Sequence, residues 1–162
     1  MRGTGPQAHR PRVKQESFSE ATMAFINWSS ELSVESVVLD EQHKSLIALI
    51  NDLHTAILRG AAQEESQRVF QELILYTESH FRCEEGMLRQ ACYPRLVAHH
   101  EQHMEFVQQA WALYDRSLAE RFTVSIDLLV FLKAWLTDHI LGTDRQYVAC
   151  LKTAKIPATA RS

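Results

Sequence analysis

Histidines spaced to share a helix face are the feature of this sequence with the clearest chemical use. Residues 98–103 read AHHEQH, which puts three imidazoles within five positions. On an α-helix, residues four apart differ by about 40° around the axis, whereas adjacent residues differ by about 100°. His99 and His103 can therefore bind one ion together, and we expect His100 to point elsewhere, toward solvent.

Similar faces recur on other segments of the chain. His80 and Glu84 lie one helical turn apart in the segment HFRCEE, which gives a second helix an imidazole and a carboxylate on one face. His43 belongs to a stripe with Ile47 and Ile50 that steps by four and three residues, so it faces a core as well. Three segments thus present metal-ligand side chains toward the same interior.

A fourth segment carries His139 and, five residues later, Asp144. A five-residue step turns through about 140° on a regular helix, so the two side chains cannot share a face there. A π-type turn or a local unwinding at Gly142, which lies between them, would bring them together. The backbone must therefore be irregular at this point if both residues serve one site.

Taken together, these side chains predict a metal site. Burying unpaired carboxylates costs several kcal/mol each unless cations offset the charge, and no Lys or Arg lies on the same stripes. Imidazole and carboxylate without thiolate favour iron, manganese or zinc over copper(I) or an iron–sulfur cluster. The set exceeds what one ion takes from a protein, so we predict a pair of ions. The predicted ligands are His43, His80, Glu84, His99, His103, His139 and Asp144.

The elements that must position these ligands are helices. The chain has 162 residues, 46% of them hydrophobic, with only five Gly and four Pro, which is enough for one well-filled helical core. Helices are predicted over about 41–59, 64–90 and 94–119, and from about 123 to Gly142. Asp40 is expected to cap the first helix, and Pro94 to open the third. The predicted fold is all-α, an up-down-up-down four-helix bundle.

The flanking segments differ from the bundle in composition. Residues 1–22 are polar and contain His9, two prolines and two glycines, so we predict a disordered leader. The bundle domain is predicted over 23–150 and a frayed tail over 151–162. Residues 24–39 are expected to form an arm across the bundle, with these apolar residues available for contact: Trp28, Leu32, Val34, Val37 and Val38.

The remaining composition excludes several classes of function. A net charge of −3 without a basic stripe argues against a nucleic-acid partner. No apolar run approaches the roughly 20 residues needed to cross a bilayer, and the start of the chain lacks the apolar core of a secretion signal. Three cysteines without a CxxC pair suit a reducing compartment, where we expect Cys83, Cys92 and Cys150 to be packing residues. The expected location is the cytoplasm.

The motifs that carry the predicted ligands resemble those of the hemerythrin family, specifically bacterial hemerythrins. The matching segments are DEQH at 40–43, HFRCEE at 80–85, YPRLVAHHEQH at 93–103 and WLTDHILGTD at 135–144. They occur in family order and at family spacing, and the resemblance covers about residues 26 to 148. Glu-x-x-His, which the ferritin-like carboxylate proteins repeat on two helices, does not occur in this chain.

The resemblance implies two non-haem irons as cofactors, bridged by carboxylates and by an oxo or hydroxo group. It assigns His99, His103 and His139 to one iron, and His43 and His80 to the other. The bridging carboxylates are then Glu84 and Asp144. Two octahedral irons have twelve positions, of which this set and the bridging oxygen fill eleven. The open position lies on the iron held by two histidines.

The function that the resemblance implies is reversible dioxygen binding, for oxygen transport, storage or delivery, and not an enzyme activity. Two alternatives stay open: an oxygen or redox sensing module that acts through a separate partner, and a diiron enzyme that processes peroxide or nitric oxide. Apolar residues one turn from the ligands are candidates for the wall of the dioxygen pocket, namely Ile47, Tyr76 and Leu136. His54 lies eleven residues after His43, about 16 Å along the axis, too far to join the cluster, so we expect it to be a packing residue or to form a hydrogen bond behind a ligand.

Overall fold

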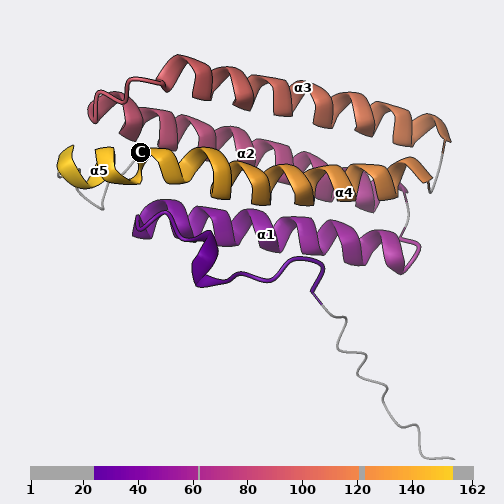
Figure 1. Cartoon of the computed structure of the whole chain (residues 1–162). Coiled ribbons are helices and arrows are strands. Elements are labelled where there is room, and N and C mark those ends of the chain that lie inside the picture. Colours follow the sequence, from indigo (N-terminus) through magenta and orange to yellow (C-terminus); the bar gives the residue numbers. More distant parts are fainter. Residues whose placement is uncertain (1–23, 62, 121–122, 155–162) are drawn as a thin grey trace, which may run out of the picture.

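The computed structural model describes residues 24–61, 63–120 and 123–154, and the long helices among them form one bundle (Figure 1). The predicted all-α bundle is confirmed. The predicted leader, with His9, and residues 155–162 of the predicted tail lie outside the described residues. None of the helices in the described part of the chain is long and apolar enough to cross a membrane. The long helices are α1 (Val37–Leu58), α2 (Gln63–Gln90), α3 (Leu96–Glu120) and α4 (Thr123–Asp138).

The helices pack in a closed ring. Each of α1 and α3 lies against both α2 and α4, so each helix has two helical neighbours. At one end of the bundle the core is hydrocarbon and aromatic: the rings of Phe70 and Tyr114 stack with centroids 4.1 Å apart, and Leu53 and Leu128 are buried. Burial of such side chains contributes about 1.5–3 kcal/mol each. The polar cluster described below occupies the opposite end.

Helix α1 begins earlier than predicted. Its N-cap is Ser36, whose side chain accepts a hydrogen bond from the Leu39 amide. Asp40, the predicted cap, lies inside the first turn and accepts hydrogen bonds from the Val34 amide at 2.8 Å and from the Ser33 hydroxyl at 2.6 Å. The prediction was wrong because this Asp side chain ties down the preceding arm instead of the helix end.

The arm before α1 lies along the outside of that helix (Figure 1). Asn51 both donates to and accepts from the Ile26 backbone, at 3.0 and 2.9 Å, and the Phe25 ring stacks on His54 with centroids 4.6 Å apart. His54 is therefore a packing residue, which is one of the two roles predicted for it. Leu32 and Val34 are buried as expected, but Val37 belongs to the helix and is 71% exposed.

The connection from α2 to α3 also differs from the prediction. The Tyr93 amide donates to the Leu88 carbonyl at 2.9 Å, and Cys92 has a positive φ of 53°, so the chain turns sharply and buries the Tyr93 ring. Pro94 lies in this turn, and α3 begins two residues later at Leu96. The exposed position of Cys92 contradicts its predicted packing role, whereas Cys83 is partly buried.

The C-terminal part continues as helix beyond the predicted boundary at residue 150. A π-helix, η2 (His139–Thr143), follows α4 and leads into a 3-10 helix, η3 (Asp144–Tyr147), and then into α5 (Val148–Ala154). Leu151 of α5 is buried, and the thiol of Cys150, itself partly buried, donates to the Ala91 carbonyl at 3.2 Å. These contacts fix the part of the predicted tail that the structure describes.

Candidate metal centre

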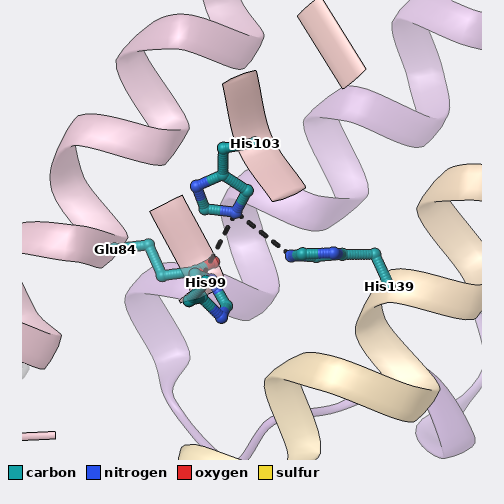
Figure 2. A group of neighbouring side chains, drawn as sticks. All are labelled: Glu84, His99, His103 and His139. Atoms are coloured by element: carbon teal, nitrogen blue, oxygen red, sulfur yellow. Dashed lines mark hydrogen bonds and ion pairs between the residues drawn. The ribbon is translucent and has the colours of Figure 1, made fainter. Parts of the chain in front are cut away.

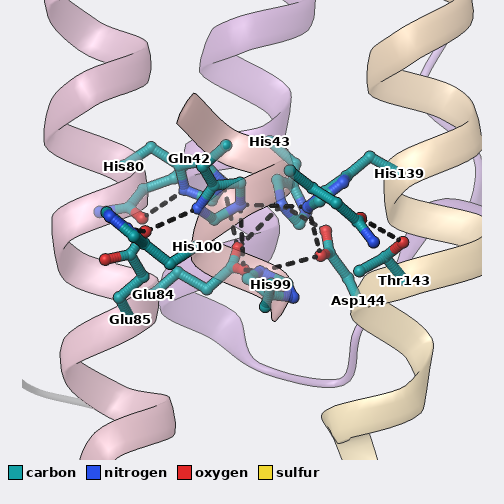
Figure 3. A network of polar contacts seen from close by, with 12 residues as sticks. Gln42, His43, His80, Glu84, Glu85, His99, His100, His139, Thr143 and Asp144 are labelled. Carbon is teal, nitrogen blue, oxygen red and sulfur yellow. Dashed lines mark hydrogen bonds and ion pairs between the residues drawn. The ribbon is translucent and has the colours of Figure 1, made fainter. Parts of the chain in front are cut away.

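A cluster of buried polar side chains lies at the end of the bundle where α1 and α3 begin and α2 and α4 end (Figure 3). It contains every ligand that the sequence predicts. The exposed fractions are 7% for His139, 3% for His80 and 0–1% for the others, which are His43, Glu84, His99, His103 and Asp144.

Glu84 lies at the middle of the cluster and contacts histidines from three helices. Its Oε2 is 3.2 Å from the Nε2 of His80 and 4.0 Å from that of His43. Its Oε1 contacts the Nε2 of His99 and lies 3.8 Å from the Nε2 of His103 (Figure 2). One carboxylate thus faces two sets of imidazoles, one set on each of its oxygens.

Asp144 reaches the same cluster through the π-helix. The five-residue turn of η2 provides the irregularity that the His139–Asp144 spacing requires, so the anticipated π-type turn is confirmed. The Asp144 carboxylate lies 3.1 Å from the Nε2 of His139, 3.6 Å from that of His43 and 3.7 Å from that of His99. A regular helix would have rotated this carboxylate away from the core.

The geometry divides the ligand atoms into two overlapping groups. Glu84, His99, His103 and His139 form one group, and His43, His80 and Glu84 form the other; within each, the candidate ligand atoms lie within 4.8 Å of one another. Glu84 is common to both groups. The arrangement suits two cations that share a carboxylate, one with more imidazoles than the other.

Without a cation, several buried polar atoms of the cluster have no hydrogen-bond partner among the described residues. Both ring nitrogens of His43, both oxygens of Asp144 and Oε2 of Glu84 are buried and lack a hydrogen-bond partner among the described residues. Buried polar atoms are almost always hydrogen-bonded, so this concentration of polar atoms without a partner needs another partner. Imidazole nitrogens and carboxylate oxygens are ligands for iron, manganese or zinc, and the residues present therefore fit a metal centre.

Electrostatics supports the same conclusion. Burial lowers the pKa of His43 to about 3, with a further contribution from His80, and burial lowers the pKa of His103 to about 2 and of His139 to about 4. These imidazoles are neutral and able to coordinate a metal at pH 7. Burial and the neighbouring Glu84 raise the pKa of Asp144 well above its usual range.

The pKa of Glu84 shifts in the opposite direction from that of Asp144. Burial alone would raise its pKa, but the neighbouring imidazoles of His80 and His99 outweigh burial and hold the pKa well below the usual range. The metal-free cluster therefore favours a charged Glu84 beside a protonated Asp144. Cations between the two carboxylates would allow both to ionise.

Two hydrogen-bond partners orient the histidine rings. The amide oxygen of Gln42 lies 2.9 Å from the Nδ1 of His80, and the carboxylate of Glu85 lies 2.8 Å from the Nδ1 of His103. Each accepts the Nδ1–H of its ring and leaves Nε2 free for the cluster. Sequence reasoning did not identify these partners, although both are direct neighbours of predicted ligands. His100 is half-exposed, as predicted, and its Nδ1 lies 3.0 Å from the same Glu85 oxygen.

Aromatic rings hold two of the imidazoles from the side. Phe81 stacks on His103 with centroids 3.6 Å apart and planes 4° apart, and Trp135 stacks on His139 at 4.2 Å and 13°. These contacts restrict ring rotation, so the ligand atoms are arranged before any cation binds.

A small apolar cavity of about 10 Å³ lies one helical turn from the cluster. Leu136 lines it, as predicted, but Ile47 and Tyr76 do not. Its walls on α1 and α2 include Leu46 and Thr77, each three residues from a predicted ligand. The prediction missed these two because it chose positions four residues from the ligands, which face slightly to one side.

Comparison with known proteins places this arrangement in a family. The model of the hemerythrin HHE cation binding domain matches residues 35–151. A bacteriohemerythrin of Stenotrophomonas maltophilia is 34% identical over 133 residues, 80% of this chain and 84% of the relative. A hemerythrin-like protein of Naegleria gruberi is 34% identical over 125 residues, 77% of this chain and 92% of the relative.

Solved structures agree with the sequence relatives. The crystal structure of a wild-type hemerythrin superimposes with a TM-score of 0.72 at 29% identity, covering 79% of this chain and 98% of that one. Fold and site define a helical-bundle protein with a buried site for non-haem iron. The chain belongs to the hemerythrin family, as its motifs indicate, and its cluster fits an oxygen-binding domain of that family.

Proposed function

We propose that this protein binds dioxygen reversibly at a diiron centre, for oxygen transport, storage or delivery, and that it is not an enzyme. The observation that carries the proposal is the pair of ligand groups that overlap at Glu84, in a chain of the hemerythrin family. A paired ferrous centre, when bound, supplies the two electrons that reversible dioxygen binding requires.

The proposed ligand assignment follows the two groups. His99, His103 and His139 hold one iron, and His43 and His80 hold the other. Glu84 and Asp144 bridge the pair, because each carboxylate lies close to imidazoles of both sets. The site with two imidazoles has one protein ligand fewer than the other, so it is the side on which we place the dioxygen position.

The residues around that position support binding over further chemistry. None of the residues that the structure shows lining the small apolar cavity is titratable. Its one hydroxyl, on Thr77, donates to the Leu73 carbonyl at 2.8 Å and so has no proton to offer a guest. A wall without a titratable group excludes water and favours release of dioxygen unchanged over its reduction to peroxide.

The proposal is tested by loading the metal-free protein with ferrous iron under nitrogen and recording optical spectra through repeated cycles of air and argon. A reversible carrier regains its air spectrum in each cycle with little loss to the diferric form. Protein loaded with zinc, which has no redox chemistry, serves as the control and should show no air-dependent change. Complete oxidation in the first exposure, or catalytic consumption of peroxide, would contradict the proposal.

A further inference from the structure

A groove between α3 and the end of α4 reaches the metal centre from outside. Its volume is about 310 Å³, and Glu105 lies on its α3 side, with Asp138, His139 and Trp135 on the other. Glu105 and Asp138 are exposed, and neither forms an ion pair with another described residue. The groove is therefore an acidic depression that ends at one of the predicted metal ligands.

His139 connects the groove with the cluster. It is 93% buried and lines the groove, and it is the most exposed of the predicted ligands at 7%. Its Nε2 faces inward, 3.1 Å from both Asp144 and the Nε2 of His103, while its Nδ1 makes no hydrogen bond to any residue in the described ranges. This ring is thus the first coordinating group that an ion in the groove would meet.

Smaller openings lined by described residues also lie close to the cluster, and two of them do not suit a cation. The apolar cavity holds about 10 Å³ and has no charged wall, so a hydrated ion would lose its water there without compensation. The second, of about 20 Å³, is lined by His99 but also by Arg95, whose guanidinium repels cations. The groove at His139 is more than ten times larger than either and carries the attractive charge.

From the groove's charge, size and contact with His139, we infer that it is the port through which ferrous iron enters the centre. Glu105 and Asp138 attract the hydrated ion, and the side chains of Gln102 and Gln109 line the path. The ion then exchanges water for the inner ligands, starting at the His139 side. The inference rests on the proposed iron centre but not on the dioxygen chemistry.

The test measures iron uptake by the metal-free protein under nitrogen, with ferrous iron alone as the probe. Uptake is stopped at set times with a chelator, and iron in the protein fraction is determined. The double variant E105Q/D138N removes both port charges and keeps the shape of the side chains. We expect it to load about three- to tenfold more slowly at low ionic strength, and to reach the same final iron content.

A matched control removes the same net charge elsewhere. D52N/D127N changes two exposed acids, one on α1 and one on α4, that lie about 13 and 18 Å along their helices from His43 and His139. It should load within about twofold of the wild-type rate. In about 0.5 M salt, where the Debye length shrinks below about 5 Å, the deficit of the port variant should disappear.

Several outcomes would overturn the inference that ferrous iron enters through this groove. Equal uptake in all three proteins removes it, and so does equal slowing in both variants, which would be an effect of net charge. A deficit that persists in high salt also counts against it, because the substitution would then have damaged the ligands. If the wild-type chain takes up no iron at all, the proposed function is wrong, and the inference about the port is wrong as well.

Discussion

Replacing Asp144 with Asn tests whether this residue is a metal ligand or a residue that only supports the fold. In the metal-free protein, burial and the nearby Glu84 raise the pKa of Asp144 well above its usual range, so the neutral carboxyl is favoured. Neither of its oxygens has a hydrogen-bond partner among the described residues. An amide of the same shape should therefore leave the stability of the metal-free bundle within about 1 kcal/mol of wild type.

With iron present, the same change should be costly. Free iron at a hundred times its dissociation constant stabilises a folded protein by about 2.7 kcal/mol. Loss of a ligand should weaken binding at least about a hundredfold, since loss of a mere outer partner costs 10–100-fold. At that affinity the stabilisation by iron falls to about 0.4 kcal/mol. The difference corresponds to a melting temperature roughly 5–9 °C lower for a chain of this size.

The assay is thermal unfolding of D144N and wild type, each with and without ferrous iron under nitrogen, with D52N as a charge control. The expected pattern is a large loss of iron-dependent stabilisation in D144N alone. Two results would contradict the assignment of Asp144 as a ligand. One is an equal loss of stability with and without iron, which would make Asp144 a structural residue; the other is full retention of the iron-dependent shift.

Three further predictions follow from the same cluster. H103A should lose bound iron, and it should also lose about 3–5 kcal/mol of stability because the substitution leaves a space beside the Phe81 ring. H100A should change the iron content little. Metal analysis measures the iron content of both variants, and urea unfolding measures their stability. G142A should raise stability by up to about 1 kcal/mol at unchanged iron content, since a Cβ there meets no atom within 4 Å; a loss of iron in this variant would show that the π-helix needs Gly. For the metal-free bundle, the lowered imidazole pKa values predict a stability that is complete above pH 6.5 and declines as the pH falls toward 2–4, because only the unfolded chain takes up the protons. Between pH 7 and 5 the three imidazoles lose about 6 kcal/mol together, and the raised pKa of Asp144 offsets part of this loss. Urea unfolding should show a net loss of stability over this range, and a flat profile would contradict the prediction.

The sequence predicted which side chains gather in the buried cluster because the relevant information is local. His99 and His103, or His80 and Glu84, share a face through spacing alone, and the helices that carry them have strong apolar periodicity. Even the π-helix followed from an inconsistency, since a five-residue step is incompatible with a regular turn. In each case the constraint involves residues close together in the chain.

Features that depend on contacts between segments were harder to predict. Asp40 has the chemistry of a helix cap, but its partners belong to the arm, whose position the sequence does not encode locally. Gln42 and Glu85 find their imidazoles on other helices, 38 and 18 residues away, so the rotation of those helices decides the contacts. The acidic groove likewise exists only because α3 and α4 pack side by side.

We propose that this cluster holds two irons that share carboxylates. The most direct test is an anomalous difference map, recorded at the iron absorption edge, from crystals of the iron-loaded protein. We expect two separate iron positions on either side of Glu84, one beside His43 and His80 and the other beside His99, His103 and His139. A single position, or iron bound elsewhere on the chain, would contradict it.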